Sequence, residues 1–345
     1  MRLPAGTYAQ SYGQDMGLIR TKAKWLFFAI LMVFLFTIPQ WASNEWLTVV
    51  TVIGITVIAA HGLNILTGNC GLVSMGHSGF MMVGGYAAAI LCSKAGLPFW
   101  VAAPIAALLA GAVGIIFGLP SLRIKGFYLI MATVAAYFIL SWLVLQFRGL
   151  TNGTDGLTLP RANVPFGTIH SKNQYFYMVM ALAVIATIVA KNILRTRPGR
   201  AFVAIRDNDL AAEVMGVNLF SYKLQAFFIG CLFAGFAGAL SVQYYSFANT
   251  EQFPFFDSVW LLGMLIVGGM GSRSGVIYGV IAIKLLQWQA IKMGPSLATI
   301  LNPQAAVGLS LILPGLAIIL FLIFAPHGIA HIWERFKNYY QHWPF

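Results

Sequence analysis

Long apolar runs separated by short polar breaks make up nearly the whole chain. A backbone in lipid must satisfy its own hydrogen bonds, and these runs are too long and uniformly apolar for the alternating strands of a barrel. They therefore predict an all-α, polytopic membrane protein with a single domain over residues 1–345. About ten transmembrane or re-entrant helices are predicted, at 24–40, 45–66, 77–94, 98–119, 126–147, 175–194, 219–245, 256–271, 275–293 and 305–325. The segments at 77–94 and 256–271 are short and glycine-rich, so either is a candidate for a re-entrant or broken helix.

Composition supports a membrane location. The chain is 59% hydrophobic and 9% charged, with a mean hydropathy of +0.80, whereas a soluble domain has about 25% charged residues. Its formal charge of +12 could suggest a nucleic-acid partner. The tendency of cytoplasmic loops to gather Lys and Arg explains that charge better, so lipid is expected as a neighbour and nucleic acid is not.

The distribution of basic residues predicts the topology. With the N-terminus inside, five lie outside (Lys94, Arg148, Arg161, Lys172 and Lys292) and fifteen lie inside: Arg2, Arg20, Lys22, Lys24, Arg123, Lys125, Lys191, Arg195, Arg197, Arg200, Arg206, Lys223, Arg273, Arg335 and Lys337. This excess predicts that both termini are cytoplasmic. The segment 1–23, the loop 195–218 and the tail 326–345 are then cytoplasmic, and the turn-rich loop 148–174 is external.

The loop 195–218 is the most polar part of the interior of the chain. Pro198 and Gly199 are predicted to break the preceding helix, and one or two short helices should follow, with Gly216 as a terminator. Asp207 and Asp209 suit a helix N-terminus. An apolar surface is predicted beside the charges, formed by Ala201, Ala204, Ile205, Ala211, Ala212 and Met215. Such an amphipathic segment either docks on a soluble partner or lies on the lipid surface, and its mixed charges favour docking.

Two glycine-rich stretches, 62–86 and 267–279, occupy similar places in the two halves of the chain. Glycine lets helices approach closely and lets the backbone bend. Their placement suggests an internal inverted repeat of the kind found in transporters.

The sequence lacks the motifs expected of an ATPase and of an ion-coupled carrier. No GxxxxGK[ST] motif is present, so this chain is not expected to hydrolyse nucleotide. Every acid falls in a loop or at the end of a predicted span, which argues against an ion-coupled carrier. Lys284 is the one charge well within a span, and it either snorkels or faces a cavity.

One pair of residues suggests an enzyme as an alternative. Ser78 lies in a GHSG sequence and His61 in AHG, which resembles fragments of an intramembrane serine protease. The His precedes the Ser, opposite to the order in those enzymes, and small-residue packing explains the glycines equally well. The i, i+4 spacing of His327 and His331 could bind a metal on a helix, but their place in a terminus beside the membrane argues against it. The scattered Cys70, Cys92 and Cys231 indicate neither a zinc site nor a disulfide framework.

Five stretches together resemble the LivM-type permease subunits of ABC importers for branched-chain (hydrophobic) amino acids. They are GLNILTGNCGLVSMGHSGFMMVGGYAAA, LRIKGFYLIMATVA, NGTDGL, PGRAFVAIRDNDLAAEVMGVNLFSYKLQAFFIGCLFAGFAGAL and LLGMLIVGGMGSRSGVIYG, between about residues 60 and 280. In such importers a cytoplasmic EAA-x3-G element docks on the ATPase. Here Ala211, Ala212 and Gly216 match it, while Leu210 stands where Glu is usual, next to Asp209.

The resemblance implies a non-enzymatic subunit in a bacterial inner membrane, with no cofactor of its own and ATP bound by other subunits. The implied partners are a second, LivH-type permease, two ATPases and a periplasmic binding protein. The residues expected to couple to the ATPase are Arg200, Arg206, Asp209, Ala211, Ala212, Glu213 and Gly216. Those expected to line the path, or else to pack helices, are Asn64, Thr67, Asn69, Ser74, His77 and Ser78. Urea, amides and aromatic acids are alternative solutes, and an intramembrane protease or an ion-coupled carrier is the alternative function.

Overall fold

The computed structural model describes residues 22–121, 126–160, 163–164, 167–168, 171–298, 303–325 and 328–342. Most of the predicted N-terminal segment 1–23 lies outside these residues. So do Arg123, Lys125 and Arg161, on which part of the charge argument depends, and His327 of the pair weighed as metal ligands.

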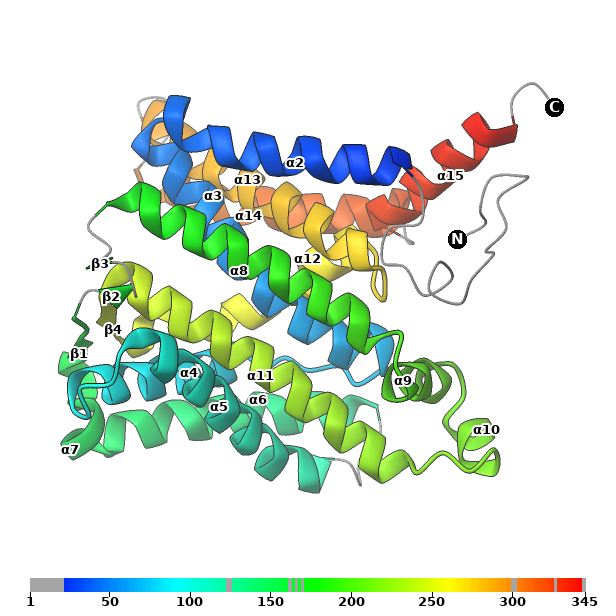
Figure 1. Ribbon diagram of the computed structural model, residues 1–345, viewed down its shortest axis with the longest axis horizontal. Coiled ribbons are helices and arrows are strands. Elements are labelled where there is room, and N and C mark those ends of the chain that lie inside the picture. The colour runs from blue at the N-terminus through cyan, green and yellow to red at the C-terminus, as the bar shows by residue number, and fades with distance from the viewer. Residues whose placement is uncertain are drawn as a thin grey trace.

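Helices dominate the described chain, as predicted from the apolar runs (Figure 1). The long ones agree with the ten predicted segments to within a few residues. They are α2 (Lys22–Trp41), α3 (Asn44–Leu63), α4 (His77–Ser93), α5 (Phe99–Ser121), α6 (Phe127–Gln146), α8 (Lys172–Ile193), α11 (Leu219–Tyr245), α12 (Phe255–Gly268), α13 (Arg273–Ala298) and α14 (Pro303–Phe324).

Not all of these helices are long enough to cross a membrane. Six of the described helices have the length and apolarity for it, or seven if the bent pair formed by α14 and α15 (Gly328–His342) is one span. The helices α4 and α12 have only 17 and 14 residues. A multi-pass membrane protein is therefore confirmed, while the count of about ten segments in the membrane stays a prediction.

Several shorter elements were not predicted. The last turn of α3 widens into a π-helix, η1 (Asn64–Asn69), and part of the predicted tail forms α15. The other short elements are α7 (Arg148–Thr151), η2 (Gly153–Asp155), β1 (Leu157–Thr158), β2 (Asn163–Val164), β3 (Gly167–Thr168), β4 (Phe247–Ala248) and η3 (Thr250–Gln252). Strand β1 pairs with β4, and β2 with β3, both antiparallel.

Small residues bring the central helices into backbone contact. A Cβ added at Gly84 of α4 would strike the backbone of Gly235 in α11, and one at Gly238 would strike the carbonyl of Met81. Association of helices in lipid depends on close van der Waals packing, which small residues allow. The helix α11 thus forms the centre of the bundle, against α3, α4 and α5.

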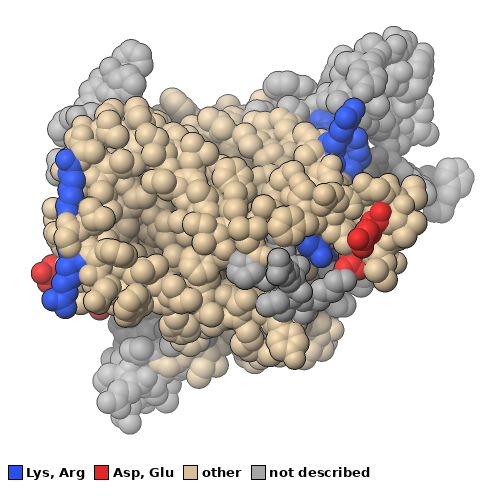
Figure 2. Space-filling view, turned by 90° about the horizontal axis from the view of Figure 1, so that it is seen from below, with Lys and Arg blue, Asp and Glu red and all other residues tan. Residues whose placement is uncertain are grey.

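The two ends of the bundle differ. The strands and α7 lie at one end, while α9 (Arg197–Asp207), α10 (Asp209–Val214), the start of α2 and α15 lie at the other (Figure 1). On the face seen in Figure 2, charged side chains gather toward these two ends and a broad uncharged band separates them. This is the arrangement that a bilayer requires. Which end faces the cytoplasm, and whether the halves form an inverted repeat, stay predictions.

Candidate functional site

The polar loop 195–218 forms two short helices, α9 and α10, that project from one end of the bundle (Figure 1). Pro198 lies in the first turn of α9, where its missing N–H is not needed. Asn208 caps α10 by accepting a hydrogen bond from the N–H of Ala211 (3.0 Å), a contact worth about 1 kcal/mol. Gly216 ends the arm with a φ of +83°, as predicted for a terminator. We call residues 197–216 the arm.

The first helix of the arm is anchored in the bundle. Phe202 is fully buried and meets the ring of Tyr222 edge-on at 6.5 Å, and Ala201 and Ile205 are buried beside it. A push on the arm would therefore be transmitted to the start of α11.

The second helix is exposed and apolar on one face. The exposed fractions of Leu210, Val214 and Met215 are 66%, 87% and 83%, and Glu213 is exposed among them. The predicted apolar surface was therefore wrong in part, because Ala201, Ile205 and Ala212 pack inward instead. The i, i+4 spacing of Leu210 and Val214 was the signal that could have identified this face, and Met215 follows them at the end of the helix. We call these three residues the apolar tip.

Charges join the arm to the glycine-rich segments. Arg206 Nη1 donates to the carbonyl oxygen of Gly68 in η1 (3.1 Å), and its Nη2 donates to Asp207 Oδ1 (2.8 Å). Asp207 is the last residue of α9 rather than at a helix N-terminus, which corrects the prediction for it. Asp209 does begin α10, and its carboxylate faces Lys223 of α11 at 4.0 Å. Asp209 thus points back to the bundle and not outward.

The remaining predicted coupling residues lie on the outside of the arm, except Ala212. Arg200 is exposed, and its Nη1 donates to the carbonyl oxygen of Arg195 (3.1 Å). Ala211 is exposed and Ala212 is buried. A Cβ at Gly216 would meet nothing within 4 Å, so its backbone conformation alone calls for glycine there.

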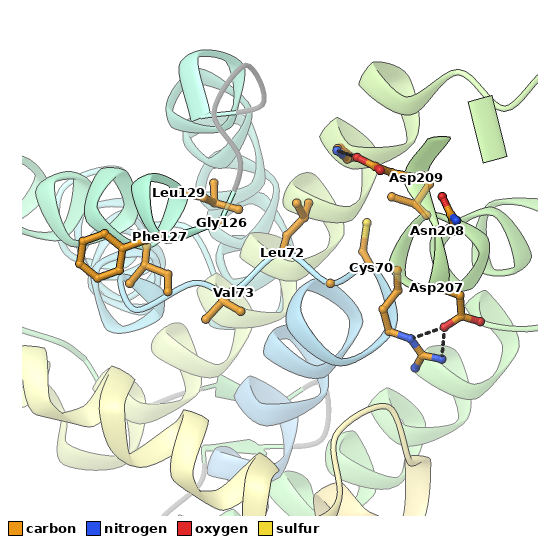
Figure 3. A pocket seen from close by; sticks show the side chains of 14 residues that line it. Cys70, Leu72, Val73, Gly126, Phe127, Leu129, Asp207, Asn208 and Asp209 are labelled. Atoms are coloured by element: carbon orange, nitrogen blue, oxygen red, sulfur yellow. Dashed lines mark hydrogen bonds and ion pairs between the residues drawn. The ribbon is translucent and has the colours of Figure 1, made fainter. Parts of the chain in front are cut away.

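A cavity of about 660 Å³ lies between the arm and the membrane helices (Figure 3). The segment 70–73, the start of α6, the end of α9 and Lys223 line it. Phe127 and Leu129 supply an apolar wall, and Asp207 and Asp209 a charged one. Burial raises the pKa of the Cys70 thiol to about 12, opposed by the nearby charge of Lys223.

The predicted path residues are all buried within this chain. Asn64 Oδ1 accepts a hydrogen bond from Gly271 N–H (2.9 Å), and Asn69 Nδ2 donates to Asn64 O (3.0 Å). Thr67 Oγ1 donates to the carbonyl oxygen of Leu72 (3.1 Å). The two glycine-rich stretches therefore meet at η1, where Asn64 joins them.

The other three path residues lie around the start of α4. His77 Nε2 donates to the carbonyl oxygen of Ala59 (3.1 Å), and Ser78 Oγ lies 2.7 Å from Ser258 Oγ. Ser74 Oγ and His77 Nδ1 have no hydrogen-bond partner in the described part of the chain. A role in translocation stays a prediction for all six residues.

The residues weighed as a protease have other partners. Ser78 is hydrogen-bonded to Ser258, and His61 Nε2 lies 3.0 Å from Thr187 Oγ1. Neither the described hydrogen bonds of Ser78 nor those of His61 join a nucleophile to a base.

Comparison with known proteins decides the family. The sequence model described as branched-chain amino acid transport system / permease component matches residues 46–322. The chain belongs to this permease family. The LivM-type resemblance seen in the sequence motifs is confirmed by two relatives, the high-affinity branched-chain amino acid transport system permease proteins LivM of Escherichia coli K12 and Salmonella typhimurium LT2.

These relatives are 32% and 31% identical to the chain over 283 residues, which cover 75% of this permease and 66% of each relative. The matched part of the permease thus spans slightly less than two thirds of the relatives' length. A probable LivM of Methanocaldococcus jannaschii is 23% identical over 65% of this chain and 66% of its own. No solved structure matches the permease.

Proposed function

We propose that this chain is a transmembrane subunit of an ABC importer in a bacterial inner membrane, forming the path for branched-chain or other small hydrophobic amino acids. One observation carries the proposal. A member of this permease family presents a rigidly anchored arm whose tip exposes Leu210, Val214 and Met215. Exposed apolar side chains on a short helix suit a groove on a partner protein.

The partner that we propose for the arm is an ATPase subunit. The chain has no phosphate-binding GxxxxGK[ST] motif, so the energy must come from another protein. Two ATPases, a second permease of the LivH type and a periplasmic binding protein complete the proposed importer. We propose that this chain itself binds no cofactor and that ATP binds to the partner subunits.

Two hydrogen bonds suggest how movement of the docked arm would be transmitted to the membrane helices. Arg206 connects the arm to η1 at Gly68, and Asn64 connects η1 to the turn at Gly271. Movement of the arm would therefore act on both glycine-rich segments at once. We propose that Arg206, with Arg200, Asp209, Ala211, Ala212, Glu213 and Gly216, couples the ATPase to the path.

Uptake of radiolabelled leucine tests this function. The chain would be produced with the ATPase, permease and binding-protein genes that neighbour its own, and uptake measured in sealed vesicles with and without ATP. ATP-dependent accumulation of leucine, isoleucine or valine supports the proposal. Uptake driven equally well by an ion gradient in the absence of ATP would show an ion-coupled carrier instead. Urea, amides and aromatic acids in the same assay test the alternative solutes.

A further inference from the structure

Two opposite charges, on Asp257 and Lys284, lie at similar depth on neighbouring helices, and both residues are half-buried. The helices α12 and α13 form a hairpin, because a Cβ at Gly268 would strike Gly275 and one at Gly279 would strike Met264. Asp257 stands eleven residues before Gly268, and Lys284 eleven residues after Arg273. At 1.5 Å per residue, both charges are about 16 Å from the turn that joins the helices. That is close to the middle of a hydrocarbon layer about 30 Å thick.

The depth of Asp257 corrects an expectation from the sequence. Asp257 does stand at the end of a helix, as predicted, but α12 has only 14 residues. A helix of that length reaches only about 21 Å, so its first turn begins inside the layer. Lys284 lies near the middle of the candidate span Arg273–Met293. Its side chain is much too short to snorkel over the roughly 13–16 Å to either interface.

Asp257 and Lys284 stand on the two helices of the hairpin, whose backbones meet at Gly268 and Gly275. Neither side chain makes a hydrogen bond or ion pair with any described residue. Tyr137 of α6 packs its ring against that of Phe255 in the first turn of α12, two residues before Asp257, with the ring centroids 5.6 Å apart. Residues of α6 and of the α12–α13 hairpin therefore meet beside Asp257.

Charges at this depth need a polar counterpart. A lysine at the centre of a membrane helix costs about 2.5–3.5 kcal/mol on insertion scales, and such residues face a bundle interior or a water-filled cavity. A carboxylate and an ammonium at similar depth, with no partner among the described residues, can together bind a group that carries both charges. An α-amino acid carries both charges on groups bonded to one carbon atom, its Cα.

We propose that Asp257 and Lys284 form a mid-membrane station for the zwitterionic head group of the transported amino acid, Asp257 receiving its ammonium and Lys284 its carboxylate. The inference rests on the proposed importer function. It adds a recognition element that acts on the head group, so it selects α-amino acids over uncharged solutes such as urea and amides. The apolar side chain of the amino acid is left to the surrounding helices.

Leucine uptake by the whole transporter tests the station. In Lys284→Met and Asp257→Asn the head group loses one charge-assisted contact, and uptake should fall about tenfold to a hundredfold. The matched control is Lys292→Met on the same helix. Lys292 faces Glu45 at 3.9 Å near the end of α13, and both side chains are more than half exposed. Uptake by this control should stay near the wild-type rate, and equal uptake by all three variants overturns the proposal.

A charge swap separates recognition from a structural ion pair. Asp257→Lys with Lys284→Asp keeps the attraction between α12 and α13 but reverses the direction of the charges. Normal thermal stability with lost uptake supports the station. Restored uptake shows that the charges only hold the helices together, and overturns it.

Thiol labelling gives a readout that does not depend on transport. Lys284→Cys should react with a charged, membrane-impermeant thiol reagent, and leucine should slow the reaction. Ile281→Cys, exposed on the same helix and apolar in the native chain, should not react. If Lys284→Cys reacts no faster than Ile281→Cys, no aqueous station exists. If the wild type transports no amino acid but Lys284→Cys still reacts, the proposed function fails while the polar cavity stands. The three native thiols are buried and serve as a low background.

Discussion

Replacement of Leu210 by Asp should weaken ATPase docking without unfolding the permease. Complete burial of a leucine side chain is worth about 1.5–3 kcal/mol. Because Leu210 is 66% exposed in the free chain, burial of that exposed part in a partner's groove is worth about 1–2 kcal/mol. An aspartate forced into the same groove adds at least about 1–3 kcal/mol, because an unsatisfied buried polar group costs that much and a charged one costs more. The sum is at least about 2 kcal/mol, which predicts affinity for the ATPase at least about 30-fold lower.

The assay is a binding titration of purified ATPase on the permease pair held in lipid nanodiscs. Leu150→Asp is the matched control, because Leu150 is 54% exposed and belongs to α7 at the opposite end of the bundle. Both substitutions are at exposed sites, so the free energy of unfolding should change by less than about 0.5 kcal/mol. If Leu210→Asp and Leu150→Asp bind the ATPase as tightly as the wild type, the apolar tip is not the docking surface.

Two further predictions concern the core and the cavity. Gly84→Ala should lower the free energy of unfolding by about 1–3 kcal/mol, because the added Cβ would strike the backbone of Gly235. The control is Gly315→Ala, whose added Cβ would meet nothing within 4 Å and should leave stability unchanged. Thermal unfolding in detergent measures both variants, and equal midpoints would contradict the helix packing. Cys70, with its pKa raised to about 12, should be almost wholly protonated at pH 8, with about one thiolate in ten thousand. Its alkylation rate, followed by mass spectrometry, should therefore still be rising steeply above pH 9, and a plateau near pH 9 would show an ordinary thiol.

Helix positions were the best-predicted feature of this chain. The predicted segment 219–245 coincides with α11, and 77–94 with α4 to within one residue. A membrane helix must be a continuous apolar run, so the sequence marks it directly. The tail 326–345 was not expected to contain a helix, because α15 is amphipathic and its polar residues resemble those of a loop.

The candidate site was predicted less completely. The position of the arm, its two helices and the glycine at its end follow from Pro198, Asn208 and Gly216, which act locally. The sequence does not predict which side of the arm faces outward. Ala212 and Leu210 are both apolar, and only the packing in the folded chain buries one and exposes the other. The question of which acid replaces the usual Glu also has a tertiary answer. Asp209 faces Lys223, and the outward position is held by Leu210 itself.

The sequence by itself determined that this protein lies in a lipid bilayer, the order of its helices and its family. Those properties depend on composition, on the spacing of apolar runs and on motifs whose members lie close together in the chain. Only the tertiary structure decided that Arg206 contacts Gly68 and that Asp257 and Lys284 lie at similar depth. Such contacts join segments separated by 138 residues in the first case and by a hairpin in the second. Their geometry is set by how closely the glycine-lined helices approach, and one-dimensional pattern does not encode that distance.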